Sequence, residues 1–307
     1  MHYLHKMQKG ATFAKMDAIV TYVDGKDPLW QEDYRRAVGP AMLDKRFRDW
    51  GTLRFHFRGL AAYMPFIERI HLVVARESQV PEWVNRSTVN VVLHAEIMPA
   101  EKLPTFNSSM IEMFLHRIPG LSEKFLYFND DMFTLGTCSE EDFFPDGNPA
   151  MGFSRGLLYF GDFRYLVHHS DSLARKALGM PSSASYIRPQ HTASPMLRSL
   201  CEEVYAKVEP EIMASLSPLR TRANYNQYLF LDYMYYKGCA QDRRLSNRHF
   251  SLAAHSIDSI CSFVRKPSAK MACINDVHMT EEKFLACREK LLAAFADALP
   301  EKCRYEL

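Results

Sequence analysis

The first half of the chain alternates short apolar runs with stretches whose apolar residues recur at helical spacing. The runs predict buried strands at 17–23, 70–75, 89–94 and 125–128, each bounded by polar or turn-forming residues. Apolar residues three or four apart predict a helix over 52–64, and another helix is expected to begin near Pro28. Strands that alternate with helices favour an α/β fold, with a mainly parallel sheet and helices on its faces.

The second half of the chain has mostly helical patterns. Helices are predicted over 194–207, 223–236 and 280–299, and short strands or a hairpin are expected within 152–163. Asn107 and Ser109 can cap a helix that should run for about three turns to Pro119-Gly120. We therefore divide the chain into an α/β part, residues 1–165, and a mainly helical part, residues 166–307, that together form one compact unit.

Composition narrows the class of protein without identifying it. The 307 residues are 47% hydrophobic and 24% charged, which is enough to bury a substantial core. The formal net charge of +2 gives no global reason to expect a nucleic-acid partner. No run of eighteen apolar residues occurs, so no integral membrane segment is expected. The N-terminal MHYLHKMQKG lacks the apolar core of an export signal, so we expect the protein to stay in the cytoplasm.

The cysteines indicate neither a disulfide framework nor a zinc site. There are seven of them, an odd number, and they are spread along the chain without a C-x-x-C pair. Reduced thiols in the core are the simplest interpretation.

Acidic residues follow two of the predicted strands. Asn129, Asp130 and Asp131 come directly after 125–128, at the end of a strand where ligands gather in open α/β sheets. Adjacent carboxylates there are suited to Mg²⁺ or Mn²⁺, which in turn hold phosphate, although a solvated turn is an equally simple reading of these three residues alone.

The first predicted strand ends at Asp24-Gly25-Lys26-Asp27. No G-x-G-x-x-G fingerprint is present, so a nucleotide-sugar held through Asp24, Asp27 and a metal is favoured over a dinucleotide, with a plain turn as the alternative. His191 lies in a loop ahead of the helix predicted from 194, a place suited to proton transfer, although a lone histidine is more often structural.

Four groups of residues carry a resemblance to a known family. They are IVTYVDGKDPLW from Ile19, RFRDWGTLRFHFR from Arg46, the words LPTFNS, HRIPGLSE and FLYFNDD between Leu103 and Asp131, and Cys273-Ile274-Asn275-Asp276. In this order they resemble the regions of the Stealth family of sugar-phosphate transferases, which includes bacterial capsule polymerases and the animal enzyme that places GlcNAc-1-phosphate on lysosomal glycoproteins. Tyr22 and Trp50 replace the usual Trp and Asn, and His191 and Arg222 are the matches to the third region.

The resemblance implies a Rossmann-like, GT-A-like fold and the transfer of hexose-1-phosphate, GlcNAc-1-phosphate being one candidate. The donor would be a UDP-sugar, the acceptor a glycan hydroxyl and the leaving group UMP, in capsular or exopolysaccharide synthesis with peripheral association to the synthesis complex. The alternatives are a metal-dependent glycosyltransferase that releases UDP, and an inactive glycan-binding or regulatory module.

Roles follow for the matched residues. The expected catalytic residues are His191, Asp24, Asp131 and Arg222; those expected to bind the donor are Asp24, Gly25, Asp27, Arg48, Arg58, Asn107 and Asn129; those expected to hold Mg²⁺ or Mn²⁺ are Asp130, Asp131, Asn275 and Asp276.

Overall fold

A five-stranded sheet forms the centre of the molecule. The computed structural model describes residues 15–39, 47–157 and 162–307, so the N-terminal decapeptide discussed above lies outside the described residues. The strands are β3 (Val89–Leu93), β2 (Ile67–Val74), β1 (Met16–Thr21), β4 (Lys124–Phe128) and β9 (Ser194–Leu197), in that spatial order. The first four are parallel and β9 runs antiparallel to β4, which confirms the predicted mainly parallel sheet.

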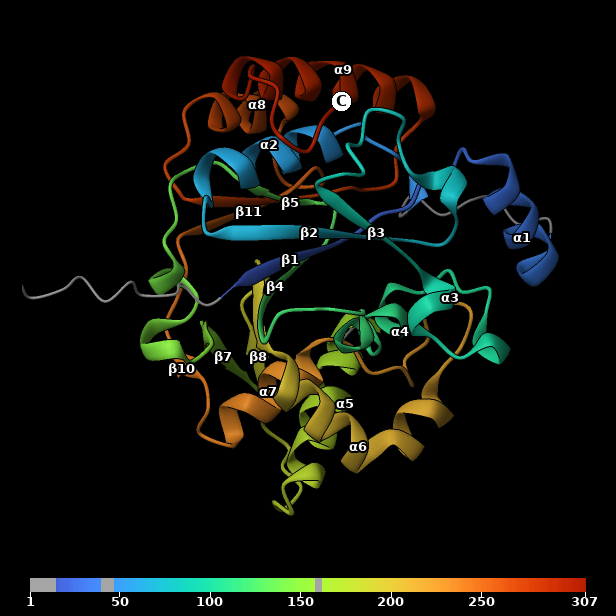
Figure 1. Ribbon diagram of the computed structural model, residues 1–307, viewed down its shortest axis with the longest axis vertical. Coiled ribbons are helices and arrows are strands. Elements are labelled where there is room, and N and C mark those ends of the chain that lie inside the picture. The colour runs from blue at the N-terminus through green and yellow to red at the C-terminus, as the bar shows by residue number, and fades with distance from the viewer. Residues whose placement is uncertain (1–14, 40–46, 158–161) are drawn as a thin grey trace, which may run out of the picture.

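Helices cover both faces of this sheet. They are α1 (Pro28–Val38), α2 (Leu53–Tyr63), α3 (His94–Ile97), α4 (Ser108–Glu112), α5 (Asp162–Ala177), α6 (Arg198–Ser215), α7 (Tyr228–Tyr236), α8 (Ile257–Arg265) and α9 (Glu281–Ala298). In Figure 1, α2, α8 and α9 lie above the sheet and α4 to α7 lie below it.

The alternation along β1 explains the two layers. Ala18 and Val20 pack on the side of α2, against Phe57, whereas Ile19 and the neighbouring Tyr127 pack on the side of α4 to α7. Successive side chains of a strand point to opposite faces, so an unbroken apolar run can bury both faces at once.

A second sheet extends the upper layer. It contains β11 (Asn247–Ser251), β12 (Met271–Asn275) and β5 (Met132–Thr134), and α8 and α9 pack on it through a separate apolar cluster. Two short pairs complete the strands, β6 (Ala150–Met151) with β10 (Gln241–Asp242) and β7 (Phe153–Gly156) with β8 (Tyr186–Pro189). β5 follows β4 directly in the chain and pairs with β12. The end of β12, at residue 275, therefore lies close to residue 131 at the end of β4.

Two predicted elements are wrong, and a third is confirmed only in part. The capped helix is only α4: from Met113 onward the backbone N–H groups bond to the carbonyl three residues back, as Arg117 N does to Phe114 O, and the chain tightens into a short 3₁₀ turn over Leu115–Arg117. A short strand does form within 152–163, as β7, but it pairs with β8 and not in a local hairpin. Residues 194–197 form β9 instead of the start of a helix, and Pro195 is tolerated there because β9 lies at the edge of the sheet.

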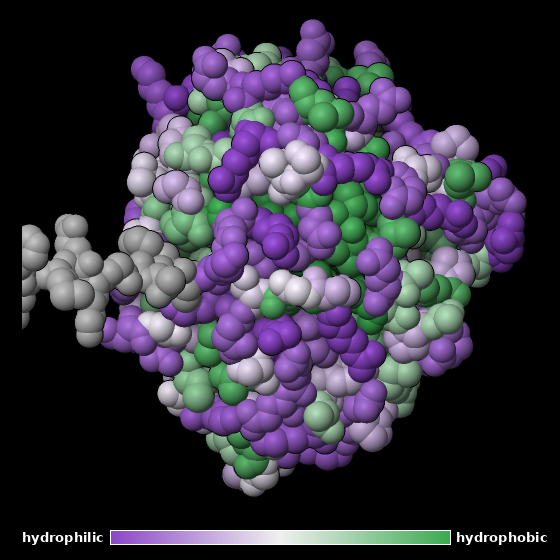
Figure 2. Space-filling model, viewed as in Figure 1, coloured by the Kyte–Doolittle hydropathy of each residue, from purple (hydrophilic) through white to green (hydrophobic). Residues whose placement is uncertain are grey.

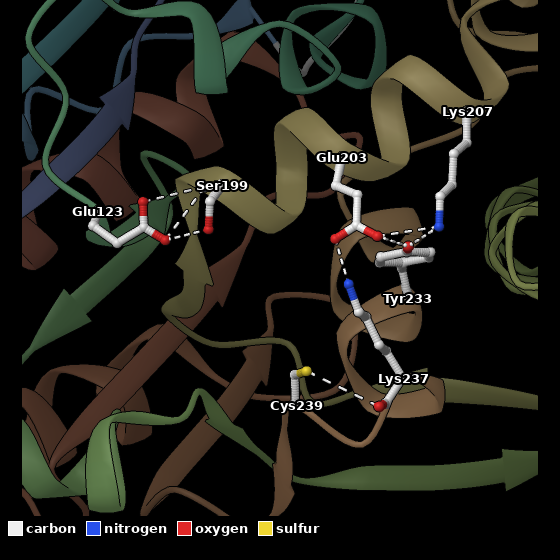
Figure 3. A network of polar contacts seen from close by, with 7 residues as sticks. All are labelled: Glu123, Ser199, Glu203, Lys207, Tyr233, Lys237 and Cys239. Atoms are coloured by element: carbon white, nitrogen blue, oxygen red, sulfur yellow. Dashed lines mark hydrogen bonds and ion pairs between the residues drawn. The ribbon is translucent and has the colours of Figure 1, made fainter.

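A polar network holds α6 against α7 (Figure 3). Glu203 accepts hydrogen bonds from Lys207 Nζ at 3.1 Å and Tyr233 Oη at 2.8 Å, and it is also paired with Lys237. These partners lower the pKa of Glu203 to about 2. At the start of α6, Ser199 is bonded through its backbone N–H and its hydroxyl to Glu123.

The visible surface is mostly polar. Figure 2 shows hydrophilic side chains over most of this face, with apolar ones in scattered patches. Within the described residues, no helix combines the length and apolar character needed to cross a membrane.

Candidate active site

A large cavity opens where β1 and β4 end. Its volume is about 680 Å³, and its lining includes Thr21 and Tyr22 after β1 and Asn129 to Asp131 after β4. From β1 the chain continues to β2 and β3 on one side, and it later returns to β4 on the other side. Ligands of open α/β sheets bind at such a switch point, so the cavity has the position that the fold favours.

Two adjacent carboxylates at the end of β4 have opposite pKa shifts. Burial and the negative charges of Asp131 and Asp49 raise the pKa of Asp130 to about 7. Burial also acts to raise the pKa of Asp131, but His191 and the Cys273 thiol outweigh it and lower that pKa. Asp131 Oδ1 is buried and has no hydrogen-bond partner among the described residues. Repulsion between like charges together with an orphaned oxygen indicates a place for a cation.

Segments distant in sequence converge on Asp131. His191 Nε2, from the loop between β8 and β9, lies 3.9 Å from Asp131 Oδ2, and Cys273 Sγ of β12 donates to the same oxygen at 3.3 Å. Ile274 N donates to the Asp131 carbonyl at 2.9 Å, and Asn247 Nδ2 donates to the His191 carbonyl at 2.9 Å. His191 therefore sits between two strands, and the expected position at a helix N-terminus is wrong.

The end of β12 completes this side of the cavity. Asn275 and Asp276 both line it, as the sequence led us to expect. Asn275 Nδ2 is 3.3 Å from His249 Nε2, and Asp276 Oδ1 accepts from Val277 N at 2.6 Å.

The floor of the cavity is a buried hydrogen-bond network. Tyr127 Oη donates to Asn129 Oδ1 at 2.6 Å and lies 3.2 Å from Thr21 Oγ1. Glu112 is close to the same hydroxyl, at 3.4 Å, and its other oxygen accepts from Gln227 N at 2.9 Å. Burial raises the pKa of Glu112. The network fixes the side chain of Asn129 relative to α4 and α7.

Three arginines line the cavity, and only one of them was among the expected phosphate ligands. Arg48 lines it, donates to Met279 O at 2.9 Å, and has a buried Nη1 without a hydrogen-bond partner in the part of the chain that the structure describes. Arg188 and Arg220 also line it, and Arg220 contacts Ser108 Oγ.

Arg58 and Arg222 do not line the cavity. The Arg58 guanidinium forms two bonds with Glu306, at 2.7 and 3.0 Å, and two more with the carbonyls of Leu299 and Pro300. Arg222 is exposed, and its Cζ lies 4.9 Å from the centre of the Tyr165 ring.

The acidic turn after β1, Asp24 to Asp27, was expected to bind the donor but does not line the main cavity. Asp24 lines a smaller neighbouring cavity of about 280 Å³, and its Oδ1 accepts from Lys26 N at 2.8 Å. Asp27 is buried and caps α1, accepting from Leu29 N at 3.0 Å and from Ser78 Oγ at 2.7 Å. These contacts make Asp27 a structural residue.

Gly25 and Asn107 likewise have structural roles. A Cβ on Gly25 would lie 2.1 Å from the Phe47 carbonyl, so only glycine allows this approach. Asn107 caps α4, and its Nδ2 donates to Asn224 Oδ1 at 3.0 Å and to Ser217 O at 3.1 Å. Neither residue lines the main cavity.

Sequence reasoning missed two acidic residues and two arginines that line the cavity: Asp49, Glu112, Arg188 and Arg220. Burial and the charge of Asp24 raise the pKa of Asp49. Asp49 is part of the motif RFRDWG, which could have identified it. Arg188 stands three residues before His191, so its nearness to a predicted site residue was also a signal. The arginine of the third family region was matched to Arg222 without an alignment. Such a match can be wrong by two residues, which is the separation between Arg222 and Arg220.

The oxygen donors fit a hard divalent cation. Mg²⁺ is commonly held by one or two carboxylates, with water and substrate phosphate completing its shell. Asp130 and Asp131 are two adjacent carboxylates of this kind, and Asn275 and Asp276 line the same cavity.

Comparisons with known proteins identify the family of the chain. Residues 46–151 match the family described as Stealth protein CR2, conserved region 2. The capsular polysaccharide phosphotransferase WcwK of Streptococcus pneumoniae is 29% identical over 95% of this chain and 99% of its own length. The capsular polysaccharide phosphotransferase cps12A of Actinobacillus pleuropneumoniae is 30% identical, over 75% of this chain and 67% of its own length.

Among solved structures, the galactosyltransferase LgtC has a TM-score of 0.40 and 12% identity, over 90% of this chain and 96% of that one. The sequence relatives carry the assignment: the chain belongs to the Stealth family of capsular polysaccharide phosphotransferases and is a sugar-phosphate transferase.

Proposed function

We propose that the chain transfers hexose-1-phosphate from a UDP-sugar to a hydroxyl of a glycan acceptor and releases UMP. One observation carries the proposal: an acidic pair, a histidine and three arginines converge on a single cavity at the β1/β4 switch point. Its volume of about 680 Å³ is within the usual range for a ligand of this size. The proposed setting is capsular or exopolysaccharide synthesis, which the names of the relatives state for those proteins.

The arginines are proposed to bind the donor diphosphate. Arg48, Arg188 and Arg220 approach the cavity from separate segments, and planar guanidinium groups suit phosphate oxygens. Asp130 and Asp131, with Asn275 and Asp276, would hold Mg²⁺ or Mn²⁺, which when bound supplies positive charge beside the diphosphate. Asp24, next to the cavity through the shared neighbours Tyr22 and Asp49, is proposed to act at its entrance.

His191 is proposed to accept the proton of the acceptor hydroxyl. The acceptor oxygen then forms a bond to the sugar-linked phosphorus, and the bond from that phosphorus to the oxygen of UMP breaks. Asp131 Oδ2 lies 3.9 Å from Nε2, so its negative charge would stabilise the imidazolium that forms. The sugar keeps both its anomeric oxygen and its phosphate.

Product analysis tests the proposal. The protein is incubated with Mg²⁺, a UDP-hexose and an oligosaccharide acceptor; nucleotides are separated by chromatography and the glycan is examined by ³¹P NMR. UMP together with a phosphodiester resonance is expected. UDP formed only in the presence of acceptor, with no phosphodiester, would instead identify a glycosyltransferase.

A further inference from the structure

Three donors of different chemistry meet at one corner of the cavity. They are Asp131 Oδ2, His191 Nε2 and Cys273 Sγ, and ligand atoms of the three residues all lie within 4.8 Å of one another. Among the residues that the structure describes, this is the only group of three or more His, Cys, Asp or Glu side chains that meets this condition. The cysteine spacing of the sequence gave no indication of it, because each donor comes from a different segment.

The backbone around the three donors is firmly held. Cys273 lies within β12 and is paired with Met132 across the ladder to β5. The Asp131 carbonyl accepts from Ile274 N at 2.9 Å, and the His191 carbonyl accepts from Asn247 Nδ2 at 2.9 Å. Donors on such fixed segments need little rearrangement to bind a metal, and this favours affinity.

The spacing of the donors fits a tetrahedral ion. Bonds of about 2.0–2.3 Å to zinc place neighbouring tetrahedral ligands about 3.3–3.7 Å apart. Asp131 Oδ2 lies 3.3 Å from Cys273 Sγ and 3.9 Å from His191 Nε2, and the ligand atoms of the three residues all lie within 4.8 Å of one another, so these two separations are close to those of tetrahedral ligands. Three protein ligands leave the fourth position for water or a substrate oxygen.

The donor set selects a different metal from the catalytic one. Mg²⁺ prefers oxygen and gains little from sulfur or imidazole, whereas a thiolate with an imidazole and a carboxylate suits Zn²⁺. We propose that Asp131, His191 and Cys273 form a binding site for a soft divalent cation such as Zn²⁺, and that its occupancy inhibits sugar-phosphate transfer. On binding, the Cys273 thiol releases its proton to solvent, and the ion takes one lone pair from each of the three residues.

Inhibition follows from which atoms the ion occupies. His191 Nε2 would no longer accept a proton, and Asp131 Oδ2 would no longer be available beside it. This part of the inference rests on the proposed function, whereas metal binding does not.

Spectroscopy of the full chain tests the binding. Chelator-treated protein is titrated with Co²⁺, whose bond to a thiolate gives a charge-transfer band in the near ultraviolet, and then with Zn²⁺ by calorimetry. One Co²⁺ per chain, the thiolate band and its loss when Zn²⁺ is added are expected. Binding without the band, or no binding above buffer background, would overturn the proposal.

Variants locate the site. Cys273→Ser keeps a hydroxyl next to Asp131 and should abolish the band and weaken Zn²⁺ binding by at least about tenfold, since it removes a direct ligand. Cys239→Ser is the matched control, because Cys239 is partly exposed and should bind any adventitious metal. His191→Ala should weaken Zn²⁺ binding to a similar extent, and it provides a second test if the first variant does not fold. Wild-type affinity in both Cys273→Ser and His191→Ala, or loss of the band in Cys239→Ser, would place the metal elsewhere.

An activity assay tests the inhibition. Free Zn²⁺ at the dissociation constant measured in the same Mg²⁺-containing buffer should halve the transfer rate, and a chelator should restore it. Full activity of the Zn²⁺-loaded protein would overturn the inhibitory role and leave the binding site standing. If no UDP-sugar is turned over, the proposed function fails while the Co²⁺ and Zn²⁺ titrations still decide on the site.

Discussion

Arg58→Ala distinguishes a structural arginine from a phosphate-binding one. Arg58 is four residues from Arg54 on α2, but its guanidinium binds the C-terminal segment instead of the cavity. It forms two bonds with Glu306, whose side chain is only 1% exposed, and two with backbone carbonyls at 2.9 and 3.0 Å. The substitution should therefore lower stability and leave donor affinity unchanged.

The contacts set the size of the effect. Removing one partner of a buried ion pair costs about 3–5 kcal/mol, because the other charge stays buried. Arg54 Nε remains 3.2 Å from Glu306 and compensates in part, so the lower end, about 3 kcal/mol, is expected. For a protein of this size that corresponds to a fall in Tm of about 5 °C. Arg54→Ala is the matched control: Arg54 is 42% exposed, and its loss should cost less than about 1 kcal/mol.

The pH dependence provides an internal check. Burial acts to raise the pKa of Glu306, but hydrogen bonds from Arg58 and Cys303 N lower it below its usual value of 4.5. A lowered pKa in the folded state stabilises the protein above the unfolded value, and this contribution disappears as the pH falls through the folded value. The stability gap between wild type and Arg58→Ala should therefore narrow below about pH 4.5.

Urea denaturation gives the free energy of unfolding, and calorimetric titration with UDP-sugar and Mg²⁺ gives donor affinity. Unchanged stability together with weaker donor binding would refute this reasoning and return Arg58 to the phosphate site.

Three further predictions concern the site and the core. Asp130→Asn should lower turnover by about 10² or more while the protein stays folded, because a preorganised electrostatic contact is lost, and full activity of this variant or of wild type in EDTA would contradict it. Arg220→Ala should weaken UDP-sugar binding, whereas Arg222→Ala should not, and calorimetry that gives the reverse order would restore the original assignment. Burial acts to raise the pKa of Asp17, but hydrogen bonds from His71 and Ser122 N lower it, so the carboxylate stabilises the fold above its usual pKa of 3.8 and this contribution is lost as the pH falls below that value. Asp17→Asn lacks this contribution and should therefore lose less stability than wild type on acidification below pH 3.8. Equal losses of the free energy of unfolding, measured by urea denaturation, would disprove the effect.

Much of the sheet could be predicted because each parallel strand is a short apolar run followed by polar residues. The order of the motifs also identified the family, and Asn129 to Asp131 do line the cavity. These features are local: a strand and the turn after it are set by a few consecutive residues, and the fold then determines that such ends share one edge.

The failures concern contacts between distant residues. Arg58 is separated from Glu306 by 248 positions, and no spacing rule connects a helix to the last residues of the chain. Asp27 and Asn107 are the exception, because their oxygens cap helices that start immediately afterwards, and the sequence had indicated that cap for Asn107. The group of Asp131, His191 and Cys273 depends on three segments, so only the folded chain shows it.

The fate of the sugar-linked phosphorus tests the central claim most directly. A UDP-hexose labelled with ³²P only at the β-phosphate is incubated with the protein, Mg²⁺ and an oligosaccharide acceptor, and glycan and nucleotides are then separated and counted. If the acceptor oxygen attacks that phosphorus, as proposed, the label enters the glycan and the nucleotide released is unlabelled UMP. Label recovered in UDP, with none in an extended glycan, would contradict the account.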